Sequence, residues 1–456
     1  LQSYLGRINY NYDHKYFLTG SLRSDGSSRL GVNNRWGLFP SGSIGWQVDK
    51  EAFLSEIAKN IKLSNAKLRL SYGRTGNSEI NPYQSLELLS SSVYPNGSGS
   101  TYTGFSPFQL ANPDLKWETT DQYDGGIDLG FFENRIKFTA DLYIKRTRDL
   151  LISTYVPNTS GYLASLQNVG EVENKGFELG LNTENVKGKF SWTTNATYTV
   201  NRNKVVSLGD GVDQITIGGG TQSGSLIKVG QPLGTFYGLK TDGLYTKDNL
   251  PGDLSTTLLG TSTKVGDIKY VDLNGDGKIT EAGDRTVIGS PQPKFIFGFT
   301  NNFSYANFDL SIFIQGSYGN QIYSYILRQL QTPNGSQNSI AGFSDHYTDA
   351  NTSAQYQRPN VSINNSTNSD LYVYDGSYVR VKSITLGYSL PKVVLSKIKV
   401  NKIRLYVSGQ NLYTFTKYPG FDPDVNSYSA DASRQGIDLG AYPSAKSIIG
   451  GINITF

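Results

Sequence analysis

The sequence predicts an all-β protein, a transmembrane antiparallel β-barrel. Three observations indicate this fold: segments of about ten residues in which apolar and polar side chains alternate, short turns beside long loops, and a composition rich in aromatic residues and glycine. With 31 Tyr, 21 Phe and 50 Gly but only 37% hydrophobic residues, the chain is typical of sheets that have one apolar and one polar face.

The alternation is clearest in the run Arg135–Lys145, where even positions are apolar and odd positions are polar or Tyr. A strand with this period presents its two faces to different environments. Counting such runs gives roughly thirteen predicted strands. They lie at Tyr4–Tyr12, Tyr16–Arg23, Ser41–Val48, Lys67–Arg74, Gln122–Phe131, Arg135–Lys145, Gly176–Thr183, Phe190–Val200, Lys294–Phe303, Phe308–Gln315, Tyr378–Tyr388, Ile403–Ser408 and Ser447–Phe456. One helix is predicted near Lys50–Asn60, where apolar residues have helical spacing and Asp49 is placed to cap.

The connections between the predicted strands fall into two length classes. Tight polar turns such as Asp13–Lys15 and Glu133–Asn134 contrast with long stretches near 77–116, 201–293 and 318–375, which are rich in Gly, Ser, Asn and Tyr. Outer-membrane barrels have short turns on the periplasmic side and longer loops outside. We therefore predict that the three long stretches are extracellular loops.

The last ten residues form the predicted terminal strand. Its apolar positions include Ile448, Ile452 and Ile454, and the chain stops on Phe456. An aromatic residue at this point suits the interfacial girdle of a membrane barrel, so these four residues are predicted to face the membrane.

Composition excludes several other classes. No run approaches the ~18 consecutive apolar residues of a membrane-spanning helix. The chain has no cysteine, so disulfides and thiolate metal sites are excluded, and a dispersed net charge of +4 gives no support for nucleic-acid binding. The two histidines, His14 and His346, fall in a turn and a loop without a catalytic partner, so we expect no enzyme activity. Methionine is absent as well, so we expect the chain to be a piece of a longer protein.

A calcium loop is predicted in the second long connection. Asp272, Asn274 and Asp276 occupy alternating positions before Gly277, and Lys278 offers a backbone carbonyl. Position 12 of the loop, counted from Asp272 as position 1, is Gly283 rather than Glu. Asp284 is therefore the carboxylate that would close a loop one residue longer. The alternative is an Asx- and Gly-rich turn that needs no ion. No other cofactor is expected.

Aromatic residues are frequent in two of the long loops. Three interpretations remain open for them: they bind sugars, they pack against a lipoprotein lid, or they hold the loops folded. The residues are Tyr94, Tyr102, Phe105 and Phe108 in the first loop and Tyr318, Tyr323, Tyr325, Tyr347 and Tyr356 in the third.

Several stretches spread over the chain resemble the SusC/RagA family of TonB-dependent outer-membrane transporters of Bacteroidota. They are Tyr16–Arg29, Trp36–Trp46, Lys67–Asn77, Asn112–Thr120, Asn168–Glu178, Asp272–Gly277 and Asn411–Asp424. The resemblance implies that residues 1–456 form the C-terminal part of a barrel of about 22 strands with a plugged lumen. The plug domain is absent from this chain and would lie upstream.

The resemblance also implies a function and partners. We expect TonB-dependent import of an oligosaccharide or peptide across the outer membrane of a Gram-negative bacterium of the Bacteroidota. The expected partners are a SusD-like surface lipoprotein, TonB acting through the upstream region, the remaining barrel strands and plug, and membrane lipid. A siderophore or cobalamin receptor is one alternative. A secreted carbohydrate-binding or adhesion protein is the other.

Overall fold

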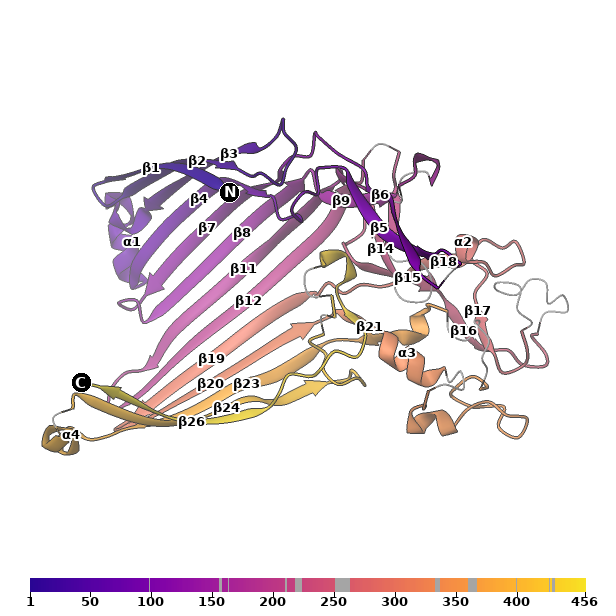
Figure 1. Ribbon diagram of the computed structural model, residues 1–456. Coiled ribbons are helices and arrows are strands. Elements are labelled where there is room, and N and C mark those ends of the chain that lie inside the picture. Colours follow the sequence, from indigo (N-terminus) through magenta and orange to yellow (C-terminus); the bar gives the residue numbers. More distant parts are fainter. Residues whose placement is uncertain are drawn as a thin grey trace. The chain divides into compact units, whose positions relative to one another are not determined.

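The computed structural model divides into two compact units built mainly of antiparallel strands (Figure 1). The first unit contains Leu1–Thr183 and Asn201–Asp213, and the second contains Glu184–Val200 and Gln214–Phe456. The structure describes residues 1–97, 99–155, 158–162, 164–209, 211–217, 224–250, 263–332, 337–359, 367–398, 400–425, 427–428 and 431–456.

Long strands that each pair with their neighbours form the wall of the first unit. Each strand pairs antiparallel with the next one in the sheet, with a register that runs along most of its length. In sheet order they are β1 (Gln2–Tyr12), β2 (Tyr16–Gly26), β3 (Trp36–Gln47), β4 (Leu63–Asn77), β7 (Glu118–Phe131), β8 (Ile136–Arg148) and β11 (Glu171–Val186).

The second unit continues the same sheet order with strands of similar length. These strands also pair antiparallel, with local register shifts where β23 meets β20 and β24. The order is β12 (Phe190–Ser207), β19 (Phe295–Tyr305), β20 (Phe308–Tyr318), β23 (Tyr378–Ser389), β24 (Lys402–Thr416) and β26 (Ser447–Thr455), with the last part of β12 belonging to the first unit.

The thirteen predicted strands are the thirteen strands of this sheet, so the all-β prediction is confirmed. The structure lengthens most of them. Strand β3 begins at Trp36, five residues before the predicted start at Ser41. Pro40 therefore lies inside the strand, where it is paired with Leu22 of β2. A proline usually marks the end of a central strand, so the sequence signal stopped short of it.

The helix prediction is only partly correct. Two 3₁₀ turns, η1 (Val48–Lys50) and η2 (Ala52–Leu54), precede a short α1 (Ser55–Asn60). Asp49 does not cap α1, because its carboxylate accepts the backbone N–H of Ala66 at 2.8 Å instead. The expectation of a single helix is wrong, since α2 (Glu281–Asp284), α3 (Tyr325–Gln331) and α4 (Lys392–Ile398) also form.

In each unit, the long connections leave from one end of its strands. Neighbouring strands are antiparallel, so successive connections alternate between the two ends of the sheet. The connections at one end are the turns after β1, β7, β11 and β19 and the short helical segments after β3 and β23. The opposite end carries the connection from β12 to β19, which is the longest, and those after β4, β8, β20 and β24.

The long connections contain structure of their own, although residues 98, 210, 218–223, 251–262, 333–336 and 360–366 of the predicted loops lie outside the described residues. Several small sheets occur in them. Their strands are β5 (Leu88–Pro95), β6 (Thr101–Gln109), β9 (Leu151–Tyr155), β10 (Ala164–Asn168), β13 (Gln214–Ile217), β14 (Ser225–Lys228), β15 (Thr235–Leu239), β16 (Thr241–Leu244), β17 (Ile268–Tyr270), β18 (Arg285–Gly289), β21 (Gln321–Ser324), β22 (Val373–Asp375) and β25 (Ile437–Asp438). Further 3₁₀ turns are η3 (Asn158–Ser160), η7 (Ala341–Ser344), η9 (Asp370–Tyr372) and η10 (Ala432–Arg434).

The buried core of the second unit lies in these connections. Phe236, Tyr323, Tyr372 and Ile437 pack together, each 1% exposed or less. The Tyr323 hydroxyl donates to Asn368 at 2.7 Å, and burial raises the pKa of Tyr323 to about 12. Tyr323 therefore helps to hold its loop folded. The wall strands, in contrast, carry many exposed apolar side chains. None of the described helices is both long and apolar enough to cross a membrane.

Candidate functional site

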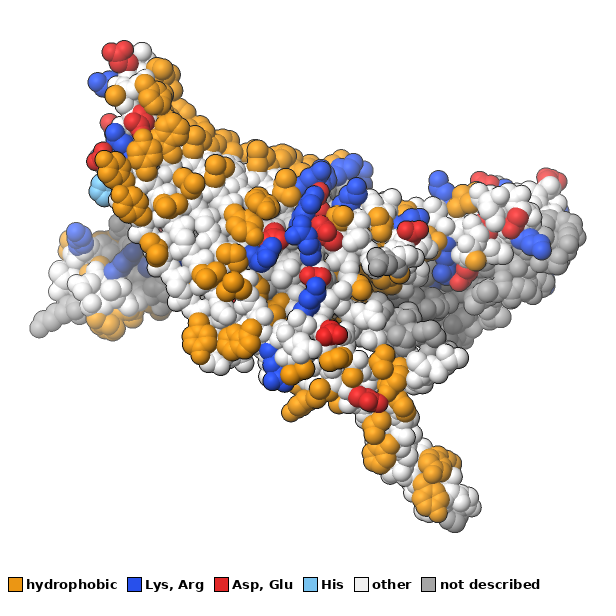
Figure 2. All heavy atoms as spheres, turned by 90° about the horizontal axis from the view of Figure 1, so that it is seen from above, with side chains coloured by type: hydrophobic (Ala, Val, Ile, Leu, Met, Phe, Trp, Pro, Cys, Tyr) orange, Lys and Arg blue, Asp and Glu red, His pale blue; other side chains and the backbone are white. Residues whose placement is uncertain are grey.

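The wall strands of the first unit have two chemically different faces. Leu18 and Leu22 of β2, Leu38 of β3 and Leu142 of β8 lie at alternating positions and are at least half exposed. Hydrophobic side chains cover much of the exposed surface in Figure 2. A folded protein in water does not expose such an extensive apolar surface without a partner.

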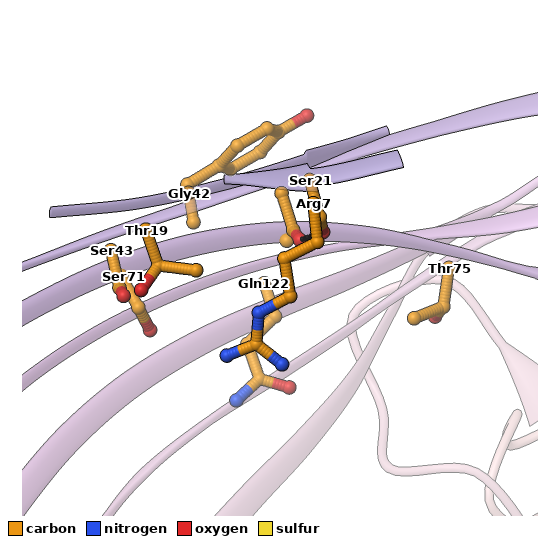
Figure 3. A pocket seen from close by; sticks show the side chains of 11 residues that line it. Arg7, Thr19, Ser21, Gly42, Ser43, Ser71, Thr75 and Gln122 are labelled. Atoms are coloured by element: carbon orange, nitrogen blue, oxygen red, sulfur yellow. Dashed lines mark hydrogen bonds between the residues drawn. The ribbon is translucent and has the colours of Figure 1, made fainter. Parts of the chain in front are cut away.

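The opposite face carries polar side chains in registered rows across the strands. One row runs from Arg7 through Ser21, Ser41 and Gly73 to Gln122, each residue paired with the next on the neighbouring strand. The side chains around this row line a shallow pocket of about 380 Å³ (Figure 3). Small hydroxyl side chains form most of its lining, while Arg7 and Gln122 supply longer polar groups.

A second pocket, of about 570 Å³, adjoins the first and shares Ser71 and Gln122 with it. Its lining is more highly charged than that of the first pocket. The remaining lining residues are Arg69, Asp124, Asp141, Tyr143, Lys145, Asn174, Glu178 and Asn201. We call the residues that line the two pockets the polar trough. It follows the face of β1–β4, β7, β8 and β11 opposite the apolar one and reaches Asn201 of β12.

Ion pairs also connect the strands, but on the face that carries the exposed apolar side chains, since Arg146 and Arg148 continue the alternation of Leu142 and Ile144 on β8. Asp121, on β7 and only 4% exposed, accepts hydrogen bonds from Arg74 at 2.7 Å and from Arg148 at 2.9 Å. Arg146 continues the network to Glu173 at 2.9 Å. Each of these arginines has an acidic neighbour, so the network ties adjacent strands together rather than offering free charge to a ligand.

The trough has no arrangement suited to catalysis. In the described ranges, no group of three or more His, Cys, Asp or Glu side chains is placed to hold a metal ion. His14 lies in the turn after β1 and contacts Asn11, and His346 stacks on Phe343. What the trough offers is a hydroxyl- and amide-rich surface that can hydrogen-bond to a polar ligand or polypeptide.

The predicted calcium loop is held by side-chain to backbone hydrogen bonds. The two carboxylate oxygens of Asp272 accept the N–H groups of Gly275 and Gly277 at 2.7 and 2.8 Å. The Asp276 carboxylate accepts the N–H of Lys278 at 2.8 Å. Buried Asp284 accepts from the amides on both sides of the loop, Leu273 and Thr280. These bonds make an Asx-rich turn, and metal binding stays a prediction.

The predicted terminal strand is β26, paired with β24. Ile448, Ile452 and Ile454 are exposed on it, and Phe456 follows its last residue. The register places Ile452 opposite Leu405, which is also exposed. Contact of this face with the membrane stays a prediction.

Sequence reasoning missed a buried arginine that joins a strand of the second unit to a long connection. Arg380 of β23 is 1% exposed, donates to Thr414 at 2.9 Å and forms an ion pair with Asp422. Asp422 also accepts the backbone N–H of Ser444 at 3.0 Å. A single guanidinium thus holds the connection 417–446 at two points. In the sequence, Asp422 falls in the stretch Asn411–Asp424, which carries a family resemblance but no signal of a buried ion pair.

A strand wall with one apolar and one polar face, and with its long connections at one end, defines an outer-membrane β-barrel. Comparison with known proteins gives the family. Residues 2–412 match the family model described as TonB dependent receptor-like, beta-barrel, and the chain belongs to this family.

The chain is similar to TonB-dependent receptor P3 of Formosa agariphila, with 40% identity over all of this chain and 45% of that protein. It is 32% identical to TonB-dependent receptor SusC of Bacteroides thetaiotaomicron, again over all of this chain and 44% of SusC. Among solved structures it matches the RagAB peptide transporter with a TM-score of 0.82 and 25% identity, covering 47% of that chain.

These relatives confirm the SusC/RagA-type prediction, with its location in the outer membrane of Bacteroidota and its lack of an enzymatic role. A secreted adhesion or carbohydrate-binding protein is no longer an alternative. The chain spans less than half the length of each relative it matches.

Replacement of Arg380 tests how the connection 417–446 is held. In Arg380→Ala, Asp422 keeps its buried carboxylate but loses its ionic partner, which costs about 3–5 kcal/mol when one member of a buried pair is removed. We expect amides of 417–446 to exchange with deuterium much faster in the variant, measured by mass spectrometry. Arg434→Ala is the control, because its pair with Asp431 is far more exposed.

The stabilisation by the pair of Arg380 and Asp422 depends on pH. Burial raises the pKa of the Asp422 carboxyl, but backbone hydrogen bonds from Asp424 and Ser444 and the charge of Arg380 outweigh burial and hold this pKa below its ordinary value. The pair therefore contributes fully above about pH 3.9 and is lost as the pH falls through the lowered pKa. Equal exchange in wild type and Arg380→Ala at neutral pH would contradict this account.

Proposed function

We propose that the complete protein imports an oligosaccharide or a peptide across the outer membrane with energy supplied through TonB. The observation that carries the proposal is the polar trough on the face of the wall opposite the apolar one. In a plugged barrel this face borders the lumen, where hydroxyl and amide groups suit a polar substrate or the plug. The SusC and RagAB relatives support the same type of transport.

The proposal requires further barrel strands and a plug. β1 and β26 are the two ends of the sheet order, and each has one hydrogen-bonded neighbour. An unpaired backbone edge inside a lipid bilayer costs several kcal/mol for each unsatisfied group. We therefore assign to the rest of the protein the strands that pair with β1 and β26, together with the plug and the segment that contacts TonB.

A SusD-like surface lipoprotein is the proposed partner on the side of the long connections. The support comes from the relatives, since the chain is similar to SusC and to the RagAB peptide transporter. The elements folded within these connections give such a lipoprotein an ordered surface, rather than loose loops, on which to rest. We accordingly place the long connections on the extracellular side.

Uptake by cells tests the proposal. Deleting the gene for the complete protein should abolish import of one labelled oligosaccharide or peptide class, and the wild-type gene should restore it. Removal of TonB or of the neighbouring lipoprotein gene should give the same loss. Loss of siderophore or cobalamin uptake, with glycan and peptide uptake intact, would support the alternative receptor type and overturn the proposed substrate class.

We propose separately that the Asp272 loop binds calcium. Each carboxylate oxygen has two lone pairs, so the amide hydrogen bonds to Asp272, Asp276 and Asp284 leave acceptor capacity for a hard cation. In this structure Asp272, Asp276 and Asp284 are not gathered around a common point. Binding would draw these carboxylates and Asn274 around the ion and tie the start of the turn to buried Asp284.

Calcium should slow proteolysis of this loop in the wild-type protein. A ligand present at a concentration of a hundred times its dissociation constant stabilises the folded state that binds it by about 2.7 kcal/mol, which is easily measured. Asp272→Ala should abolish the effect, while Asp242→Ala, an exposed aspartate paired with Lys269, should keep it. Equal proteolysis with calcium and with a chelator in the wild type would reject the metal site.

A further inference from the structure

The connection between β3 and β4 presents apolar side chains outward. Phe53, Ile57 and Ile61 are 66%, 54% and 51% exposed and follow one another at intervals of four residues. Ile57 lies in α1, Phe53 lies in the 3₁₀ turn η2 before it, and Ile61 is the first residue after it. We call these three exposed side chains the apolar face of the segment. Ala58 is buried, which shows that a different side of α1 packs against the protein.

This segment is fixed to the wall rather than loosely attached. The Glu51 carboxylate accepts the hydroxyl of Tyr16 at 2.5 Å and the indole N–H of Trp46 at 3.1 Å. Asp49 accepts the N–H of Ala66 at the start of β4. Carboxylates on the segment are thus bound to side-chain and backbone donors of β2, β3 and β4, so the outward direction of the apolar face is set by the fold.

The apolar face of the segment is continuous with the apolar face of the strands. The rings of Phe53 and Trp46 are 6.4 Å apart, and Trp46 lies opposite Tyr16 in the β2–β3 register. Leu18 and Ile44, the next pair on that face, are more than half exposed. In an outer-membrane barrel this strand face contacts lipid, and aromatic residues mark the membrane interface.

The segment lies at the strand ends that carry the turns after β1 and β7, away from the long connections (Figure 1). Lysines flank the apolar face. Lys50, Lys59 and Lys62 are exposed, and the ammonium group of Lys62 lies 5.6 Å from the centre of the Phe132 ring. Such side chains reach from an apolar surface to the phosphate groups of a lipid leaflet.

We propose that residues 48–62 form an interfacial segment of the barrel. Phe53, Ile57 and Ile61 insert into the lipid leaflet on the short-connection side, and the lysines lie at the level of its phosphate groups. The occupant of this apolar face is therefore phospholipid rather than a protein. The chemistry matches that of interfacial helices, which combine one buried apolar face with a cationic border.

Spin labels on the complete protein in vesicles of phosphatidylethanolamine and phosphatidylglycerol test the proposal. The chain has no cysteine, so labels are introduced at Ile57→Cys, at lipid-facing Ile44→Cys and at Ser55→Cys on the other side of α1. Any cysteine elsewhere in the protein is first replaced by serine. Collision rates with oxygen, which partitions into lipid, and with a water-soluble nickel chelate are then measured at each label.

We expect the ratio of oxygen to nickel collisions at position 57 to approach that at position 44 and to exceed that at position 55 several-fold. A ratio at 57 equal to that at 55 would show that the face lies in water and would overturn the proposal. Exclusion of both reagents at 57 would also overturn it, because a protein surface would then cover the face.

Discussion

Backbone hydrogen bonding between neighbouring antiparallel strands is the interaction on which the rest of this structure depends. It fixes the register, and the register decides which side chains share a face. The rows that run from Arg7 to Gln122 on one face, and the exposed leucines on the other, follow from this pairing. A shift of one residue on any strand would exchange its apolar and polar sets. The two chemical environments of the wall therefore depend on correct pairing along its whole length.

The wall has little buried core of its own, so the core is formed where the connections fold. In the first unit Leu30, Phe39, Leu115 and Trp117 pack together around the connections that follow β2 and β4. In the second unit the cluster around Phe236 and Tyr323 has the same role. A barrel wall can keep its apolar residues exposed because lipid covers them. The connections extend beyond the lipid, so their apolar side chains must pack against one another to be shielded from water.

The wall was predictable from the sequence because each strand carries its own signal. The run Arg135–Lys145 shows the two-residue period without reference to any other part of the chain, and β8 contains nearly all of it. The connections carry no such local signal. Arg380 and Asp422 are 42 residues apart, and only folding reveals that they form a buried pair. The short 3₁₀ turns before α1 likewise depend on Glu51 reaching Tyr16 and Trp46, which no helical period indicates.

The polar trough, likewise, is only partly predictable from the sequence. Alternation gives the polar face of each strand, but the trough needs the register of eight strands, which a single sequence does not supply. In the loop at Asp272, residue order shows which side chains carry oxygen atoms, and their binding of an ion stays a prediction. Their hydrogen bonds to backbone amides became visible only in three dimensions.

The central claim is that one face of each wall strand contacts lipid and the other contacts water or polypeptide. Single fluorophores placed at positions 142, 143, 144 and 145 of β8, in the complete protein reconstituted with brominated phospholipid, test it most directly. We predict strong quenching in place of Leu142 and Ile144 and weak quenching in place of Tyr143 and Lys145. Uniform quenching at all four positions would contradict the account, because it would show that the two faces of the wall share one environment.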